Sequence, residues 1–154
     1  MTNNYEEILI SDKEKKDKYG EIFTPFSLIK KMYDIIPDKY FKLKDMKWLD
    51  PGAGTGHFSI FLLERLNEGL KEEIPNNNER RSHIIKNMIY MVELQQDNII
   101  HLKKIFGEKA NILNGDYREI EFNELRFDFV VGNPPYNFQG MKKVPTNVIK
   151  KKKE

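Results

Sequence analysis

The chain contains no cysteine among its 154 residues. Disulfide bonds and thiolate metal ligands are therefore excluded. Its three histidines are scattered, so we expect no metal site either. No apolar run approaches the roughly 18–20 residues that cross a bilayer, and the polar N-terminus resembles no signal or transit peptide. We expect no membrane partner and a location in the cytoplasm or another reducing intracellular compartment.

An excess of charge of one sign is also lacking, because 26 basic residues stand against 24 acidic ones. The stretch Lys150–Glu154 supplies four of the basic residues and one of the acidic, which leaves 22 and 23 in the rest of the chain. The net charge therefore argues neither for nor against a nucleic-acid partner. With 39% hydrophobic and 32% charged residues, the composition is typical of a globular domain.

Apolar runs that fit buried strands alternate with amphipathic stretches that fit helices. The predicted strands are a short run ending at Asp50, then Met88–Glu93, Ala110–Leu113 and Phe127–Val131. The predicted helices start at Pro25 with Thr24 as N-cap and stop at Pro37, run from about His57 to Leu70, and cover Gln95–Phe106. Glu72–Ser82 predicts a surface loop or a small insertion. The alternation predicts an α/β fold with helical crossovers between parallel strands.

Each predicted strand is followed by a polar or glycine-rich signal. These are Asp50 with its glycine loop, Glu93, Asp116 and Asn133. Because ligands of open α/β sheets bind at the carboxyl ends of the strands, we expect these four positions to form one rim.

The loop after Asp50 carries alternating glycines at Gly52, Gly54 and Gly56. Glycine lets a backbone turn sharply and approach a ligand, although a plain strand-to-helix turn would use the same pattern. Glu93 can accept hydrogen bonds from the two hydroxyls of a ribose. Asp116 can accept hydrogen bonds from an exocyclic amine or an adenine edge, or it can form a local turn of its own backbone.

The sequence Asn133-Pro134-Pro135-Tyr136 is the most specific signal. Two prolines stiffen the backbone and remove two N–H donors, which leaves carbonyl acceptors. The Asn133 amide oxygen and the Pro134 carbonyl can then both face an incoming amine. The Tyr136 ring can stack on a planar base or amide.

These motifs together resemble the N-terminal, cofactor-binding part of S-adenosylmethionine-dependent DNA adenine-N6 methyltransferases, over roughly Tyr19–Gly140. The resemblance implies a partial Rossmann-like class I methyltransferase fold, with a mostly parallel sheet and helices on both faces. It implies a cofactor site for S-adenosyl-L-methionine, made of Phe23, Thr24, Pro25, Asp50, Gly52, Ala53, Gly54, Gly56, Glu93 and Asp116. It implies catalysis by Asn133, Pro134, Pro135 and Tyr136, with Tyr136 and Phe138 holding the two faces of the substrate base.

The implied reaction is methyl transfer to the N6 amine of an adenine flipped out of DNA, as in restriction-modification. The same amine-binding motif would serve a protein glutamine amide or RNA, and a non-catalytic relic that only binds the cofactor is a further alternative. The segment Phe23-Thr24-Pro25 favours the DNA class.

We expect three regions: a polar arm over 1–18, a catalytic domain over 19–140, and a lysine-rich tail over 141–154. The resemblance implies further strands and a target-recognition domain, for which the residues after Tyr136 show no pattern. We therefore expect a fragment or half of a split gene, completed by a second chain that carries the missing strands and reads the DNA.

Overall fold

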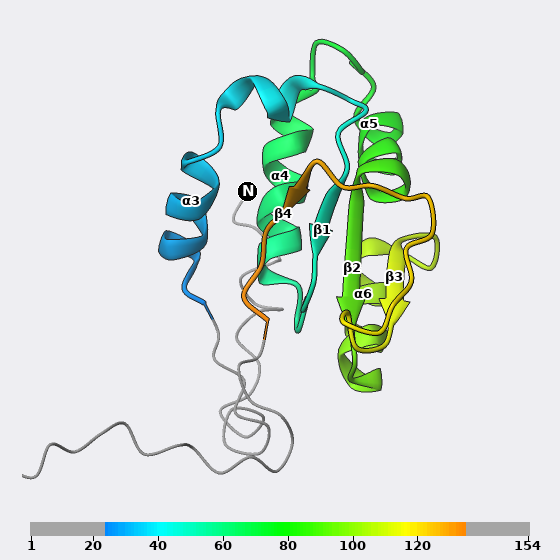
Figure 1. Cartoon of the computed structure of the whole chain (residues 1–154). Helices are drawn as coiled ribbons and strands as arrows, with labels where there is room; N and C mark the ends of the chain where they lie inside the picture. Colours follow the sequence, from blue (N-terminus) through cyan, green and yellow to red (C-terminus); the bar gives the residue numbers. More distant parts are fainter. Residues whose placement is uncertain (1–23, 135–154) are drawn as a thin grey trace, which may run out of the picture.

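A computed structural model describes residues 24–134, in which one or more helices precede each of the first three strands (Figure 1). The fourth strand follows the third without a helix between them, so the predicted helical crossover is absent from that connection. The strands are β1 (Trp48–Asp50), β2 (Ile89–Glu93), β3 (Asn111–Asn114) and β4 (Phe129–Val130). The helices are α3 (Phe26–Asp34), η1 (Asp38–Lys42), α4 (His57–Gly69), α5 (Asn77–His83), η2 (Ile84–Met88) and α6 (Gln96–Phe106). Of these, η1 is a 3₁₀-helix and η2 a π-helix.

The four strands form one sheet in the order β3-β2-β1-β4, and every pairing is parallel. In the register, Trp48 of β1 lies between Ile89 of β2 and Phe129 of β4. The predicted α/β class with a parallel sheet is confirmed. Since all strands run the same way, their carboxyl ends meet at one edge of the sheet.

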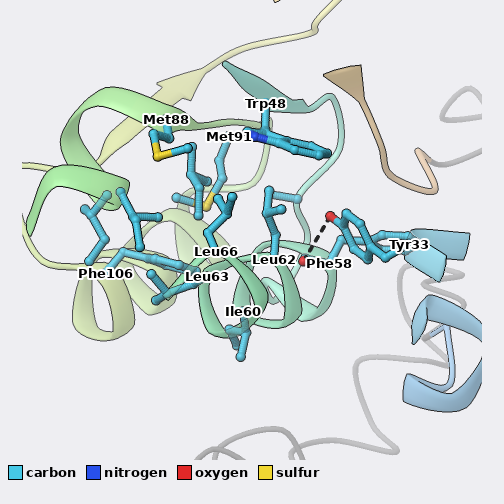
Figure 2. Packing of buried hydrophobic residues seen from close by; sticks show 14 of the residues in the cluster. Tyr33, Trp48, Phe58, Ile60, Leu62, Leu63, Leu66, Met88, Met91 and Phe106 are labelled. Carbon is cyan, nitrogen blue, oxygen red and sulfur yellow. Dashed lines mark hydrogen bonds between the residues drawn. The ribbon is translucent and has the colours of Figure 1, made fainter. Parts of the chain in front are cut away.

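The core lies between α4 and the sheet. Figure 2 shows Leu62 and Leu66 of α4 pointing toward Trp48 and Met91 of the sheet, and all four are almost fully buried. The Trp48 ring stacks between Phe41 and Phe129, with ring centroids 5.0 and 4.3 Å away. This aromatic stack links η1, β1 and β4, which are distant from one another in the sequence.

Helix α3 starts differently from the prediction. Pro25, not Thr24, is the N-cap residue, and no side chain caps the helix. The Pro25 carbonyl instead accepts from the backbone N–H groups of Leu28 and Ile29, at 2.9 and 3.0 Å. The prediction of Thr24 as N-cap is therefore wrong, and the Thr24 hydroxyl is used elsewhere.

The helix α3 is fixed to α4 by apolar and polar contacts. Ile29 and Tyr33 are buried, and the Tyr33 hydroxyl donates to the Phe58 carbonyl at 3.3 Å (Figure 2). Arg65 of α4 donates to Asp34 and Asp38, each at 2.7 Å. These contacts set where the residue just before α3 can lie.

The predicted loop Glu72–Ser82 contains helix α5, so that prediction is wrong over its second half. The Asn76 side chain accepts from the backbone N–H groups of Asn78 and Glu79, at 3.0 and 3.1 Å. The run of three asparagines is thus an N-cap followed by a helix start, not a loop. The π-helix η2 follows at once, which moves Met88 out of the predicted second strand.

Arg80 of α5 is buried, and its guanidinium donates only to neutral acceptors in the hydrogen bonds found for it. These acceptors are Asn67 Oδ1 at 2.9 Å, Asn77 Oδ1 at 2.9 Å, and the carbonyls of Ile74 and Pro75 at 2.7 and 3.0 Å. One side chain therefore holds together the whole connection between α4 and α5.

Gly69, near the end of α4, marks a close approach between two segments. A Cβ at this position would lie 2.3 Å from the Phe41 carbonyl oxygen. We expect Gly69→Ala to lower the free energy of unfolding by about 1–3 kcal/mol, since the added methyl overpacks the contact with rigid backbone. Urea denaturation measures the change. Glu64→Ala, an exposed position on the same helix, is the matched control, and equal stabilities of the two variants would contradict the close approach.

Candidate functional site

The glycine loop folds back onto the end of β2 through Glu93. One Glu93 oxygen accepts from the Gly54 N–H and the other from the Gln95 N–H, both at 2.7 Å. The Ala53 N–H also donates to the Val92 carbonyl, at 2.9 Å. The structure therefore brings together the loop and the acid that the sequence placed on two different strands.

Two glycines of the loop have a backbone that favours glycine. Gly54 has φ +53° and Gly56 has φ +94°. A Cβ on Gly56 would lie 2.8 Å from Leu102 Cδ2, so the start of α4 packs directly against α6. A Cβ on Gly54 would have no atom within 4 Å among the described residues, so the loop faces open space there.

Asp50 is directed inward and not toward the rim. Its carboxylate accepts from the Ser59 hydroxyl at 2.9 Å and from the Gly52 N–H at 3.4 Å, and the residue is only 4% exposed. Burial raises the pKa of Asp50 to about 7, with a smaller contribution from the charge of Glu93 and an opposing effect of its two hydrogen bonds. The Asp50 side chain thus connects β1 to the loop and to α4 through these two hydrogen bonds.

The segment just after β4 passes very close to Asp50. The Val131 N–H donates to the Leu49 carbonyl at 2.9 Å. A Cβ on Gly132 would lie 2.7 Å from Asp50 Oδ1 and 2.9 Å from Pro51 Cδ. Only glycine fits this passage, and it delivers Asn133 and Pro134 to the same edge of the sheet as the loop.

Asn133 also meets the segment before α3. Its Nδ2 donates to the Thr24 hydroxyl oxygen at 3.1 Å, and Thr24 is buried. Thr24, the loop after Asp50, and Asn133 therefore converge, as expected for one site.

Asp116 forms a local turn at the end of β3. Its carboxylate accepts from the Arg118 backbone N–H at 3.0 Å and from Arg118 Nε at 2.8 Å, with a further contact to Nη2. The hydrogen bond from the Arg118 side chain is the main reason that the pKa of Asp116 is lowered to about 2. Of the two readings left open by the sequence, this geometry is that of the local turn; the contact to a cofactor adenine stays a prediction.

Four predicted site residues, Phe23, Pro135, Tyr136 and Phe138, lie outside the described residues, as do the arm 1–18 and the tail 141–154. Three residues of the site were not predicted: Ser59, Gly132 and Arg118. Ser59 had a signal, since it is a polar residue on the buried side of an apolar helix. Gly132 had no sequence signal beyond its place between a predicted strand and Asn133.

Within residues 24–134, no group of three or more metal-binding side chains gathers. Over the same residues, no helix is long and apolar enough to cross a membrane.

Comparison with known proteins gives consistent results. A family model described as N-6 DNA Methylase matches residues 1–153. The type I restriction enzyme MjaIX methylase subunit of Methanocaldococcus jannaschii is 30% identical over 120 residues, which are 77% of this chain and 19% of that protein. The modification methylase CviBIII of Paramecium bursaria Chlorella virus NC1A is 29% identical over 137 residues, 88% of this chain and 30% of that protein.

Among solved structures, a modification subunit of a putative type I restriction enzyme from Vibrio vulnificus YJ016 has the same fold, with a TM-score of 0.55 and 22% identity. The match covers 86% of this chain and 27% of that one. The chain thus spans 19% to 30% of the length of these relatives.

Glu93→Gln tests the link between the loop and β2. The glutamine amide puts its own N–H₂ opposite one of the two backbone N–H donors, which leaves a buried donor unsatisfied. We expect the free energy of unfolding to fall by about 1–3 kcal/mol, as measured by urea denaturation. Glu124→Gln, at an exposed position, should change it by less than about 0.5 kcal/mol. A Glu93→Gln protein as stable as the wild type would show that the two hydrogen bonds do not hold the loop.

Asp50→Asn tests the buried carboxyl through pH. The pKa of Asp50 is about 7 in the folded state against 3.8 for the free side chain, so the folded state holds the proton more tightly. The wild type therefore loses stability as the pH rises from about 4 to 7, and asparagine does not. We expect the unfolding free energy of the variant, relative to the wild type, to rise across this window by on the order of 1–3 kcal/mol.

The control for this experiment is Ser59→Ala, which keeps the carboxyl and should retain the sense of the wild-type pH dependence. A constant difference between Asp50→Asn and the wild type from pH 4.5 to 8 would mean that Asp50 does not titrate in this range.

Proposed function

The chain belongs to the N-6 DNA methylase family, and on that premise we propose that it supplies the cofactor-binding and catalytic segments of an adenine-specific DNA methyltransferase. The observation that carries the proposal is the convergence of the glycine loop, Glu93 and Asn133 at one edge of the sheet. The loop and Glu93 would bind a cofactor and Asn133 an amine, and a plain strand-to-helix turn would not require them to lie at the same edge of the sheet.

The proposed cofactor is S-adenosyl-L-methionine, and the loop fits it. Gly54 faces open space, and Glu93 stands beside it with a carboxylate that accepts one N–H per oxygen. A carboxylate has about four acceptor positions, and the hydrogen bonds found for Glu93 among the described residues occupy two, so two would remain for the hydroxyls of a ribose. Asp116 would contact the adenine from the end of β3, where Arg118 already holds its carboxylate.

When bound, this cofactor supplies an electrophilic methyl group on a sulfonium. The role of this chain's own residues would be to orient the acceptor amine. The Asn133 amide oxygen and the Pro134 carbonyl accept its two N–H groups, which aims the nitrogen lone pair at the methyl carbon. The loop and Glu93 would hold the cofactor that supplies the methyl group, while Asn133 and Pro134 would hold the amine that receives it.

The proposed substrate is the N6 amine of an adenine flipped out of the DNA stack. Pro135, Tyr136 and Phe138 would complete the pocket and hold the base. Because the two relatives named above are a modification methylase and the methylase subunit of a type I restriction enzyme, a restriction-modification setting is favoured. Since those proteins are much longer, we propose that DNA reading and full activity depend on further sequence, on this chain or on a second one.

Asn133→Ala separates the two proposed tasks. We expect titration calorimetry with S-adenosylmethionine to give the same affinity as the wild type, within about twofold. Transfer of a radioactive methyl group to unmethylated DNA should fall by about 10²-fold or more, since a group that orients the amine is lost.

Asn78→Ala, an exposed asparagine on α5, should change neither quantity. Loss of cofactor binding by a folded Asn133→Ala protein would contradict this division of roles. A wild type that binds no S-adenosylmethionine would refute the cofactor proposal, and transfer to RNA or to a glutamine amide in place of DNA would replace the substrate.

A further inference from the structure

Asn133 and Thr24 are 109 residues apart in the chain and form a hydrogen bond of 3.1 Å between Asn133 Nδ2 and Thr24 Oγ1. We propose that Thr24 is a positioning residue that holds the Asn133 amide in place at the edge of the sheet, where it would meet the acceptor amine. The inference rests on the proposed function for its catalytic meaning. It differs from the role that the sequence predicted for Thr24, which was contact with the cofactor.

Thr24 is held in place from its C-terminal side. It is only 9% exposed. The next residue, Pro25, has a φ of −58° fixed by its ring, and its carbonyl accepts the first backbone hydrogen bonds of α3. Because α3 is itself packed on α4 through Ile29 and Tyr33, the Thr24 hydroxyl lies at a defined point relative to the glycine loop.

Asn133 is held from both sides. Gly132 packs against Asp50 and Pro51 so closely that no side chain fits. Pro134 restricts the backbone of the residue before it to extended conformations. The side chain of Asn133 therefore leaves a fixed backbone, and its hydrogen bond with Thr24 restricts where its amide can lie.

The two ends of an asparagine amide have almost the same shape and opposite hydrogen-bonding character. With Nδ2 donating to Thr24, Oδ1 lies on the other branch of the amide and would accept from the amine in the proposed complex. Because a hydroxyl can donate as well as accept, Thr24 fixes the place of the amide and not the choice of its end. The loss of this hydrogen bond should affect the transfer step more than cofactor affinity.

Two substitutions distinguish this role. Thr24→Val keeps the shape and removes the hydroxyl, and Thr24→Ser keeps the hydroxyl. Ser27→Ala, at an exposed position three residues on, is the matched control. All are made in the 154-residue chain labelled with ¹⁵N, and Asn133→Asp identifies the Asn133 side-chain signals by their disappearance.

The direct readout is hydrogen exchange of the Asn133 side-chain N–H₂. We expect Thr24→Val to speed this exchange by about two- to tenfold, as one lost hydrogen bond implies, while Thr24→Ser and Ser27→Ala stay near the wild type. Unchanged exchange in Thr24→Val overturns the proposal. This readout needs no cofactor, so it decides the contact even if the wild type binds no S-adenosylmethionine and the proposed function fails.

The functional readout separates positioning from cofactor contact. In Thr24→Val, we expect kcat for methyl transfer to fall by about tenfold while the Kd and the KM for S-adenosylmethionine change by less than about twofold. Thr24→Ser should restore kcat. A weakened cofactor affinity with unchanged kcat would make Thr24 a cofactor contact and overturn the positioning role.

Discussion

The Glu93 carboxylate is the contact on which the geometry of the site depends. It accepts the Gly54 and Gln95 N–H groups at once, so it closes the glycine loop of β1 onto the entry of α6. The loop conformation in turn sets the start of α4, where Gly56 packs against Leu102. Because carboxylates accept such bonds strongly when buried, one side chain at the end of β2 fixes both the shape of the loop and the position of two helices.

Asp50 and Gly132 extend this order to the neighbouring strand. The Asp50 carboxylate accepts a hydrogen bond from Ser59, and Gly132, two residues after β4, packs against Asp50 with no room for a side chain. The position of Asn133 therefore depends on the same loop that faces the proposed cofactor. Thr24 adds a third segment through its bond with Asn133, so residues from three distant parts of the sequence share one rigid frame.

Much of this was predictable because the relevant signals are local. Apolar runs closed by Asp50 and Glu93 predicted β1 and β2, and alternation with helices predicted the parallel sheet that is observed. Other features depend on contacts between distant residues and left little signal. The three consecutive asparagines at 76–78 are as typical of a loop as of a helix start. In the structure, Asn76 is the N-cap of α5. The Thr24 hydroxyl could serve its own helix or Asn133, and only the packing of α3 decides between them.

The buried Arg80 has a consequence for how this chain can vary. Its guanidinium is satisfied by carbonyl and amide oxygens spread over the connection between α4 and α5, from Asn67 to Asn77. Connections on a protein surface ordinarily tolerate insertions and deletions. Here a change of even one residue in length would draw acceptors away from a buried charge, whose desolvation is costly. We expect this segment, although it lies between two helices, to keep a constant length among related sequences, as a strand of the core would.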